Sequence, residues 1–252
     1  MLQIQPFYSD CFNYEVLAEK RGLFFEALEL SFDNVSDEKY NWYRNSGYVK
    51  SLHGVFIDVN PASGDSVISE YSKKKYEESC IKALECGAGN VVFHSTCFPF
   101  LRGSYIEAWA DKCAAFYYYL AEKYSGLNIF IENSMDIDPE PIKRIVESVA
   151  CRNVGVCLDI GHINYSGVPH EEWFDILGDR TGYLHLSDNK GRFDDHLPIG
   201  DGTVNWDRVR GLIKYLPEDI PVTLEVGSVG NIEKSLRFMK ENHFSEVLCY
   251  EG

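Results

Sequence analysis

The chain has 252 residues, 45% of them hydrophobic, and a formal net charge of −15. This length suits the single core of an α/β barrel. The negative charge argues against broad electrostatic binding to nucleic acid or an anionic membrane. Such a partner could bind only through a local cluster of basic residues. No apolar run approaches the roughly 20 residues that span a membrane, and the N-terminus lacks a basic segment followed by an apolar one. We therefore expect a cytoplasmic protein without a membrane partner.

Short apolar segments alternate with longer amphipathic segments along the whole chain. The predicted strands are residues 2–7, 24–32, 51–57, 90–94, 128–133, 154–160, 183–187 and 221–226. The predicted helices are residues 14–21, 37–47, 67–86, 105–124, 141–150, 171–179, 206–216 and 231–242. The segment 24–32 is also compatible with a helical start. Eight strand-then-helix units without a linker predict a single-domain (β/α)8 TIM barrel over residues 1–252. A doubly wound open sheet is the alternative, and the lack of a GxGxxG turn after the first strand speaks against it.

The eight cysteines form no CxxC pair and no spacing typical of a zinc knuckle or a disulfide framework. Cys157 lies in a predicted strand, and Cys80 and Cys113 lie in predicted helices. We expect most of the cysteines to be reduced thiols in the core.

Metal-type ligands follow many of the predicted strands. The stretch VGVCLDIGH ends in Asp159 and His162, and GYLHLSDNKGRFDDH carries His185, Asp188, Asp194 and His196. The ends of other strands supply His53, His94, Glu132 and Glu225. In a parallel barrel these strand ends meet at one face.

Each such residue has a structural explanation when taken alone. A histidine at a strand end is commonly a hydrogen-bonded core residue, and Glu132 would also suit a helix cap or a pair with Arg144. Taken together, buried carboxylates at neighbouring strand ends repel one another unless cations or protons compensate them. Mixed oxygen and nitrogen ligands suit Mn²⁺, Zn²⁺, Co²⁺ or Fe²⁺ better than Ca²⁺. The pattern predicts a bound divalent metal.

The segments HGVFIDVNPASGD, VVFHS, IEN, CLDIGH, HLSDNKG and DDHLPIGDG resemble, in this order, the xylose isomerase-like barrel superfamily. That superfamily contains sugar isomerases and epimerases and also the endonuclease IV type of DNA-repair enzyme. The resemblance covers nearly the whole chain and implies a shared metal on the four ligands of the ketose 3-epimerase branch, Glu132, Asp159, His185 and Glu225. The endonuclease branch binds three zinc ions, and its ligand positions match those four together with His53, His94, His162, Asp194 and His196.

With one metal, Glu132 and Glu225 would be the acid and base. The metal would polarise a substrate carbonyl and stabilise an enediolate, while one glutamate removes the proton next to the carbonyl and the other delivers a proton. Delivery to the same carbon gives an epimerase, and delivery to the neighbouring carbon gives an isomerase. His162 would orient the substrate or Asp159.

Further residues are candidates for substrate contact. Lys190, Arg192 and His196 would contact sugar hydroxyls or a phosphate, and Phe56 would stack on a sugar face or line the lid of the core. We predict a sugar or sugar-phosphate isomerase or epimerase that uses Mn, Zn or Co, with one ion favoured over three. Its partner would be a small-molecule sugar. Assembly into a homo-oligomer is compatible with the sequence but is not indicated by any feature of it.

Two other functions are compatible with the sequence. A three-zinc phosphodiesterase acting on abasic DNA would use all the candidate ligands, but the net charge opposes DNA binding and only residues 187–205 form a long predicted loop. A non-enzymatic sugar or metal sensor would lack an acid or a base, whereas Glu132 and Glu225 are both present.

Overall fold

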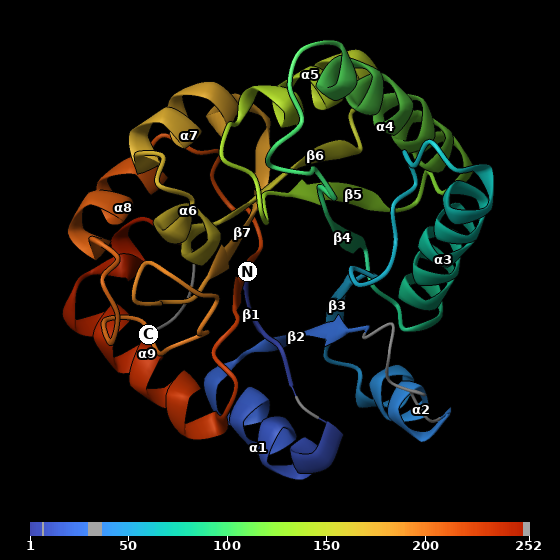
Figure 1. The fold of residues 1–252 in the computed structure, drawn as a ribbon. Helices are drawn as coiled ribbons and strands as arrows, with labels where there is room; N and C mark the ends of the chain where they lie inside the picture. Colours follow the sequence, from blue (N-terminus) through green and yellow to red (C-terminus); the bar gives the residue numbers. More distant parts are fainter. Residues whose placement is uncertain (7, 30–36, 249–252) are drawn as a thin grey trace. The chain divides into compact units, whose positions relative to one another are not determined.

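The computed structural model describes residues 1–6, 8–29 and 37–248. Within these residues, eight strands follow one another in sequence order around a closed barrel, and helices alternate with them (Figure 1). This arrangement confirms the predicted (β/α)8 TIM barrel. It excludes the doubly wound open sheet, because the strand order is unbroken and closes on itself. The ends of two predicted strands, residue 7 and residues 30–32, lie outside the described residues.

The bounds of the elements agree with the predicted alternation. The strands are β1 (Leu2–Ile4), β2 (Phe24–Leu28), β3 (Val49–His53), β4 (Asn90–His94), β5 (Asn128–Glu132), β6 (Val154–Asp159), β7 (Thr181–Leu186) and β8 (Val222–Leu224). The helices are α1 (Cys11–Arg21), α2 (Asp37–Ser46), α3 (Ser66–Glu85), α4 (Ser104–Lys123), α5 (Glu140–Val149), α6 (Ile160–Ser166), α7 (His170–Leu177), α8 (Trp206–Ile213) and α9 (Val229–Glu241).

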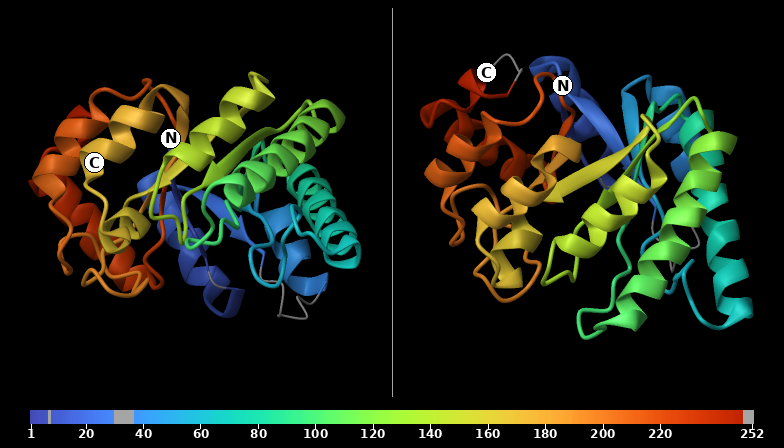
Figure 2. Two further views of the ribbon diagram at one scale, coloured as in Figure 1. Left: turned by 45° about the horizontal axis from the view of Figure 1, so that its top comes forward. Right: turned by 90° about the horizontal axis from the view of Figure 1, so that it is seen from above.

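The chain forms two compact units, one of residues 27–156 and one of residues 1–26 together with 157–252. In the unit of residues 27–156, β3, β4 and β5 pair in parallel, and His94 at the end of β4 faces Glu132 at the end of β5. The helices α3 and α4 run side by side in this unit (Figures 1 and 2). The Tyr76 ring on α3 stacks on Phe93 of β4, with ring centroids 4.2 Å apart.

The strand predicted over residues 51–57 is β3, which ends earlier, at His53. A Cβ atom at Gly54 would lie 2.2 Å from Cε1 of Phe93, so only glycine fits where the chain passes that ring. The segment 54–65 then connects β3 to α3, and residues 95–103 connect β4 to α4. The prediction that only residues 187–205 form a long connection was therefore wrong.

In the unit of residues 1–26 and 157–252, β1 pairs in parallel with β2 and with β8, and β7 pairs with β8. The short helix α6, which the sequence pattern did not predict, begins directly after β6. The carboxylate of Asp159 accepts a hydrogen bond from the backbone N–H of His162 and caps this helix. A predicted metal ligand therefore also starts a helix.

The cysteines in the described part of the chain are all free thiols, and Cys249 lies outside that part. Cys80, Cys113 and Cys157 are buried, as predicted. Burial raises the pKa of Cys80 to about 12, so this thiol stays protonated at neutral pH. Among the described residues, no helix is both long and apolar enough to cross a membrane.

Candidate functional site

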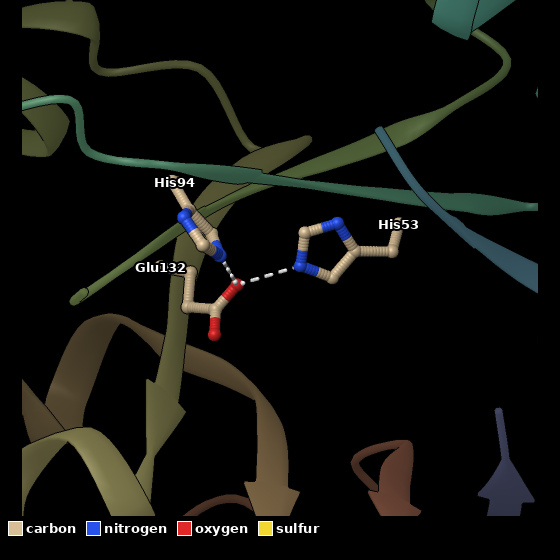
Figure 3. Close-up of side chains that lie close together, drawn as sticks. All are labelled: His53, His94 and Glu132. Atoms are coloured by element: carbon tan, nitrogen blue, oxygen red, sulfur yellow. Dashed lines mark ion pairs between the residues drawn. The ribbon is translucent and has the colours of Figure 1, made fainter. Parts of the chain in front are cut away.

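Three predicted ligands from neighbouring strands meet in the unit of residues 27–156. The Glu132 carboxylate lies between the imidazoles of His53 and His94 (Figure 3). Its Oε2 atom is 3.3 Å from Nε2 of His53 and 3.5 Å from Nε2 of His94. Glu132 is fully buried, and one ligand atom from each of the three residues lies within 4.8 Å of the others. The geometry follows from the sheet, because β3, β4 and β5 are adjacent parallel strands: His94 pairs with Glu132, and His53 pairs with Val92, two residues before His94.

The contacts of His53 indicate which of its two ring nitrogens carries the hydrogen in the neutral ring and which presents a lone pair to the Glu132 carboxylate. Nδ1 of His53 lies 3.0 Å from the carbonyl oxygen of Gly54, which only accepts, so Nδ1 carries the ring hydrogen. In a neutral ring the lone pair on Nε2 is then directed at Glu132. A lone pair and a carboxylate oxygen at this distance require a cation or an additional proton between them.

Phe56 lies beside this group. Its ring centroid is 5.0 Å from that of His53 and 4.9 Å from that of His94, so the phenyl ring packs on both imidazoles. Phe56 therefore forms an apolar side of the His53–His94–Glu132 group. Its predicted contact with a sugar stays a prediction.

Three more predicted ligands meet in the unit of residues 1–26 and 157–252. One ligand atom each from Asp159, His185 and Glu225 lies within 4.8 Å of the other two, and all three residues are buried. Nδ1 of His185 is 3.4 Å from Oε1 of Glu225. Asp159 ends β6, His185 lies in β7 and Glu225 directly follows β8. Two carboxylates and an imidazole in this proximity form a donor set suited to a divalent metal.

A third buried acid, Glu26 in β2, touches this group and was not among the predicted site residues. Its Oε2 atom is 3.1 Å from Nε2 of His185 and accepts a hydrogen bond of 2.6 Å from the Tyr183 hydroxyl. The side-chain amide of Gln5 donates to Glu26 and also to Glu225. A glutamate inside an apolar strand was the only signal that the sequence offered.

His162, Asp194 and His196 form a second cluster in the same unit. Oδ2 of Asp194 is 3.3 Å from Nε2 of His162 and 2.9 Å from Nε2 of His196. Nδ1 of His196 is 2.8 Å from the backbone oxygen of Glu225. Both nitrogens of His196 thus face acceptors, which requires that both carry a hydrogen.

The ionisation of this cluster follows from those contacts. Burial alone would lower the pKa of His196, but its hydrogen bond with Asp194 and the nearby Glu225 carboxylate raise that pKa to about 10. Burial opposes ionisation of Asp194, yet the hydrogen bonds from His162 and His196 outweigh it and hold the pKa of Asp194 well below its usual range. His196 is therefore a cation at neutral pH that pairs with the Asp194 carboxylate, and its predicted contact with a substrate stays a prediction.

The segment that carries Asp194 and His196 is held by Asp188, which the sequence pattern had grouped with the metal ligands. The fully buried carboxylate of Asp188 accepts hydrogen bonds from the backbone N–H groups of Asn189, Gly200 and Val204 and from the indole of Trp206. Donors thus surround both carboxylate oxygens. Asp188 is an anchor of the loop rather than a ligand.

Lys190 and Arg192 lie on the exposed part of the same loop. The Arg192 guanidinium carbon lies 5.5 Å from the centroid of the Phe193 ring. No carboxylate pairs with either cation among the described residues. Their predicted role in substrate binding stays a prediction.

Buried acids and imidazoles at the carboxyl ends of barrel strands define a class of barrel proteins whose site is built to hold a cation. The chain belongs to the family described as xylose isomerase-like TIM barrel, whose model matches residues 27–242. This result confirms the resemblance inferred from the sequence.

Two relatives illustrate the range of the family. An uncharacterised protein of Methanocaldococcus jannaschii is 29% identical over 201 residues, which cover 75% of this chain and 68% of the relative. A probable endonuclease 4 of Ureaplasma urealyticum is 25% identical over 201 residues, covering 69% of this chain and 64% of the relative.

Solved structures agree on the fold. A D-tagatose 3-epimerase-like protein is 26% identical with a TM-score of 0.73, covering 86% of this chain and 88% of that one. The IolI protein with a bound zinc atom is 18% identical with a TM-score of 0.74, covering 100% of this chain and 99% of that one. An L-ribulose 3-epimerase is 12% identical with a TM-score of 0.72, covering 93% of this chain and 89% of that one, and it shares the barrel fold.

Proposed function

We propose that this protein is a divalent-metal-dependent isomerase or epimerase of a sugar or sugar phosphate. The observation that carries the proposal is the buried group of Asp159, His185 and Glu225, whose ligand atoms lie within 4.8 Å of one another. The likeness to a D-tagatose 3-epimerase-like protein supports the sugar substrate. We assign Mn²⁺, Zn²⁺ or Co²⁺ to the site, because the donors are carboxylate oxygens and an imidazole nitrogen.

Glu132 is the proposed fourth ligand. Its assignment rests on the family resemblance and on its position at the end of β5, since residues at the carboxyl ends of barrel strands carry the chemistry of TIM-barrel enzymes. The proposal uses one ion, and up to three would be held if the His53–His94–Glu132 group and the His162–Asp194–His196 cluster also took part.

When bound, the ion would polarise the substrate carbonyl and stabilise the enediolate. Glu225 and Glu132 would transfer the proton, one as base and the other as acid. The Gln5 amide, which donates to the Glu225 carboxylate, would hold that carboxylate in place. Both N–H groups of His196 already face acceptors, so its positive charge would attract a substrate phosphate without a hydrogen bond of its own, and Lys190 and Arg192 would contact that phosphate directly.

The decisive experiment measures metal content and proton exchange. Protein purified without chelators would be analysed for metal by elemental analysis and then incubated in D₂O with D-tagatose, D-allulose, L-ribulose and their phosphates, with and without Mn²⁺. We expect about one ion per chain and deuterium incorporation next to the carbonyl. Absence of any metal after reconstitution, or absence of exchange on ketoses and their phosphates, would refute the proposal.

The variant Glu225→Gln tests the acid/base assignment. We expect it to fold and to lose exchange by at least about a hundredfold, the usual contribution of a general acid or base. Glu233→Gln is the matched control, because Glu233 lies on the surface, where Oε1 is 4.0 Å from Lys20 and from Arg21. Normal exchange by the Glu225 variant would show that this residue is neither acid nor base.

A second function, endonuclease IV-like hydrolysis of abasic DNA with three zinc ions, is favoured by one specific observation. The imidazoles of His53 and His94 contact the Glu132 carboxylate, and the three residues form a second group of metal-type ligands in addition to Asp159, His185 and Glu225. His94→Ala separates the two functions, because it should lower the zinc content of a three-metal enzyme and leave that of a one-metal enzyme unchanged. Cytoplasmic location and a homo-oligomeric state stay predictions that cell fractionation and light scattering would test.

A further inference from the structure

The carboxylate of Glu26 occupies a fully buried position in the middle of β2. Two hydroxyl groups donate hydrogen bonds to its Oε2 atom, that of Tyr183 at 2.6 Å and that of Thr223 at 2.5 Å. The amide of Gln3 donates to the Tyr183 oxygen at 2.8 Å and so leaves the Tyr183 hydrogen for Glu26. Such donors stabilise the ionised form of a carboxylate that burial would otherwise disfavour.

The third contact of this oxygen is with His185. Nε2 of His185 is 3.1 Å from Oε2 of Glu26. An ionised carboxylate only accepts hydrogen bonds, so Nε2 carries a hydrogen. A neutral imidazole then has its lone pair on Nδ1, the atom that lies 3.4 Å from Glu225. The ring thus presents its lone pair to the two other members of the group, Asp159 and Glu225.

We propose that Glu26 is a positioning residue that fixes the His185 ring so that Nδ1 is the atom that binds the metal. The inference rests on the proposed function in so far as it takes Asp159, His185 and Glu225 as the metal site. A carboxylate that accepts the second ring hydrogen of a ligating histidine holds the orientation of the ring and makes its lone pair a stronger donor.

The side-chain amide of Gln5 connects Glu26 to Glu225, the proposed acid/base residue. Nε2 of Gln5 lies 3.3 Å from Oε1 of Glu26 and also donates to Oε1 of Glu225. One amide nitrogen carries two hydrogens and serves both carboxylates. Glu26 therefore orients a metal ligand through one oxygen and the amide that holds Glu225 through the other.

Zinc binding by Glu26→Gln tests this role without any measurement of turnover. Metal-free protein is prepared by chelation and titrated with Zn²⁺ in a calorimeter. We expect the variant to bind Zn²⁺ about 10- to 100-fold more weakly than the wild type, the usual effect of losing the outer partner of a ligating histidine. Glu29→Gln is the matched control. Glu29 is a buried glutamate just after β2, but it contacts Ser79 and Lys82, so its loss should leave zinc affinity unchanged.

The wild type offers a second measurement that depends on no variant. A long-range ¹H–¹⁵N spectrum of histidine-labelled, zinc-loaded protein should show His185 with a hydrogen on Nε2 and zinc on Nδ1. Zinc on Nε2, or a Glu26→Gln variant that folds and binds zinc within about threefold of the wild type, would overturn the inference.

The two proposals fail in different ways. If the wild type binds zinc with the Nε2–H form of His185 but exchanges no proton on any ketose, the isomerase proposal fails and the role of Glu26 holds. If the metal-free wild type carries the hydrogen only on Nδ1 of His185, the role of Glu26 fails, whatever the enzyme catalyses.

Discussion

Replacing Asp188 by asparagine tests how the loop of residues 187–205 is held. The carboxylate accepts N–H groups from Asn189 at 2.9 Å and Val204 at 3.1 Å on Oδ1, and from Gly200 at 3.0 Å and Trp206 at 2.8 Å on Oδ2. In asparagine one of these oxygens becomes an NH₂ group, which faces two donors and accepts from neither. Each lost hydrogen bond to a charged acceptor is worth about 1.5–3 kcal/mol, so the variant should lose about 3–6 kcal/mol.

Differential scanning calorimetry of metal-free protein measures this loss. For a chain of this size, 1 kcal/mol corresponds to about 2–4 °C in Tm, so we expect Tm to fall by about 6–24 °C. Hydrogen exchange of the Gly200 and Val204 amides should accelerate more than that of amides in β7. Asp195→Asn is the control, since Asp195 is exposed on the same loop and its substitution should change Tm by no more than about 2 °C. A Tm for Asp188→Asn within that margin, with unchanged exchange, would refute the anchoring role.

Two further predictions concern pH and metal. Burial and the Arg208 cation lower the pKa of His170 to about 4, so the stability that the neutral ring provides is complete above about pH 6.5 and is lost as the pH falls from there to 4. His170→Gln should flatten the Tm–pH curve in that interval, and an unchanged slope would contradict this assignment. Mn²⁺ at about 100 times its Kd should stabilise the wild type by about 2.7 kcal/mol, measured as a rise in Tm. The Glu225→Gln variant should show a smaller rise in Tm at the same Mn²⁺ concentration. An equal rise in the wild type and the variant would show that Glu225 is not a metal ligand.

The barrel could be predicted because its signals are local. Alternating strand and helix patterns each need only ten to twenty residues, and their order leaves few topologies. Asp159, His185 and Glu225 were predicted together for the same reason, since a strand end is visible in the sequence and parallel strands end at one face. The helix α6 was missed because it is only seven residues long and its N-cap, Asp159, looked like a ligand alone.

Glu26 could not be predicted because its partners are distant in the chain. Tyr183, His185 and Thr223 are separated from it by 157, 159 and 197 residues. In the sequence, Glu26 interrupts the apolar run of a predicted strand and makes that segment also compatible with a helical start. The pairing of β7 with β8, of β8 with β1 and of β1 with β2 brings these side chains together in the unit of residues 1–26 and 157–252.

Asp188 and Glu225 show why residue type alone does not assign a role. Both are buried acids that follow a barrel strand, and both were grouped with the metal-type ligands on the sequence alone. Asp188 has its two oxygens on N–H donors, which satisfy its charge and leave it structural. Glu225 instead has an oxygen 3.4 Å from Nδ1 of His185, a nitrogen that the contact with Glu26 leaves without a hydrogen in the neutral ring. Two electron-rich atoms at that distance call for a cation or a further proton. The groups that contact each carboxylate, rather than the carboxylate itself, therefore distinguish the anchor Asp188 from the proposed ligand Glu225.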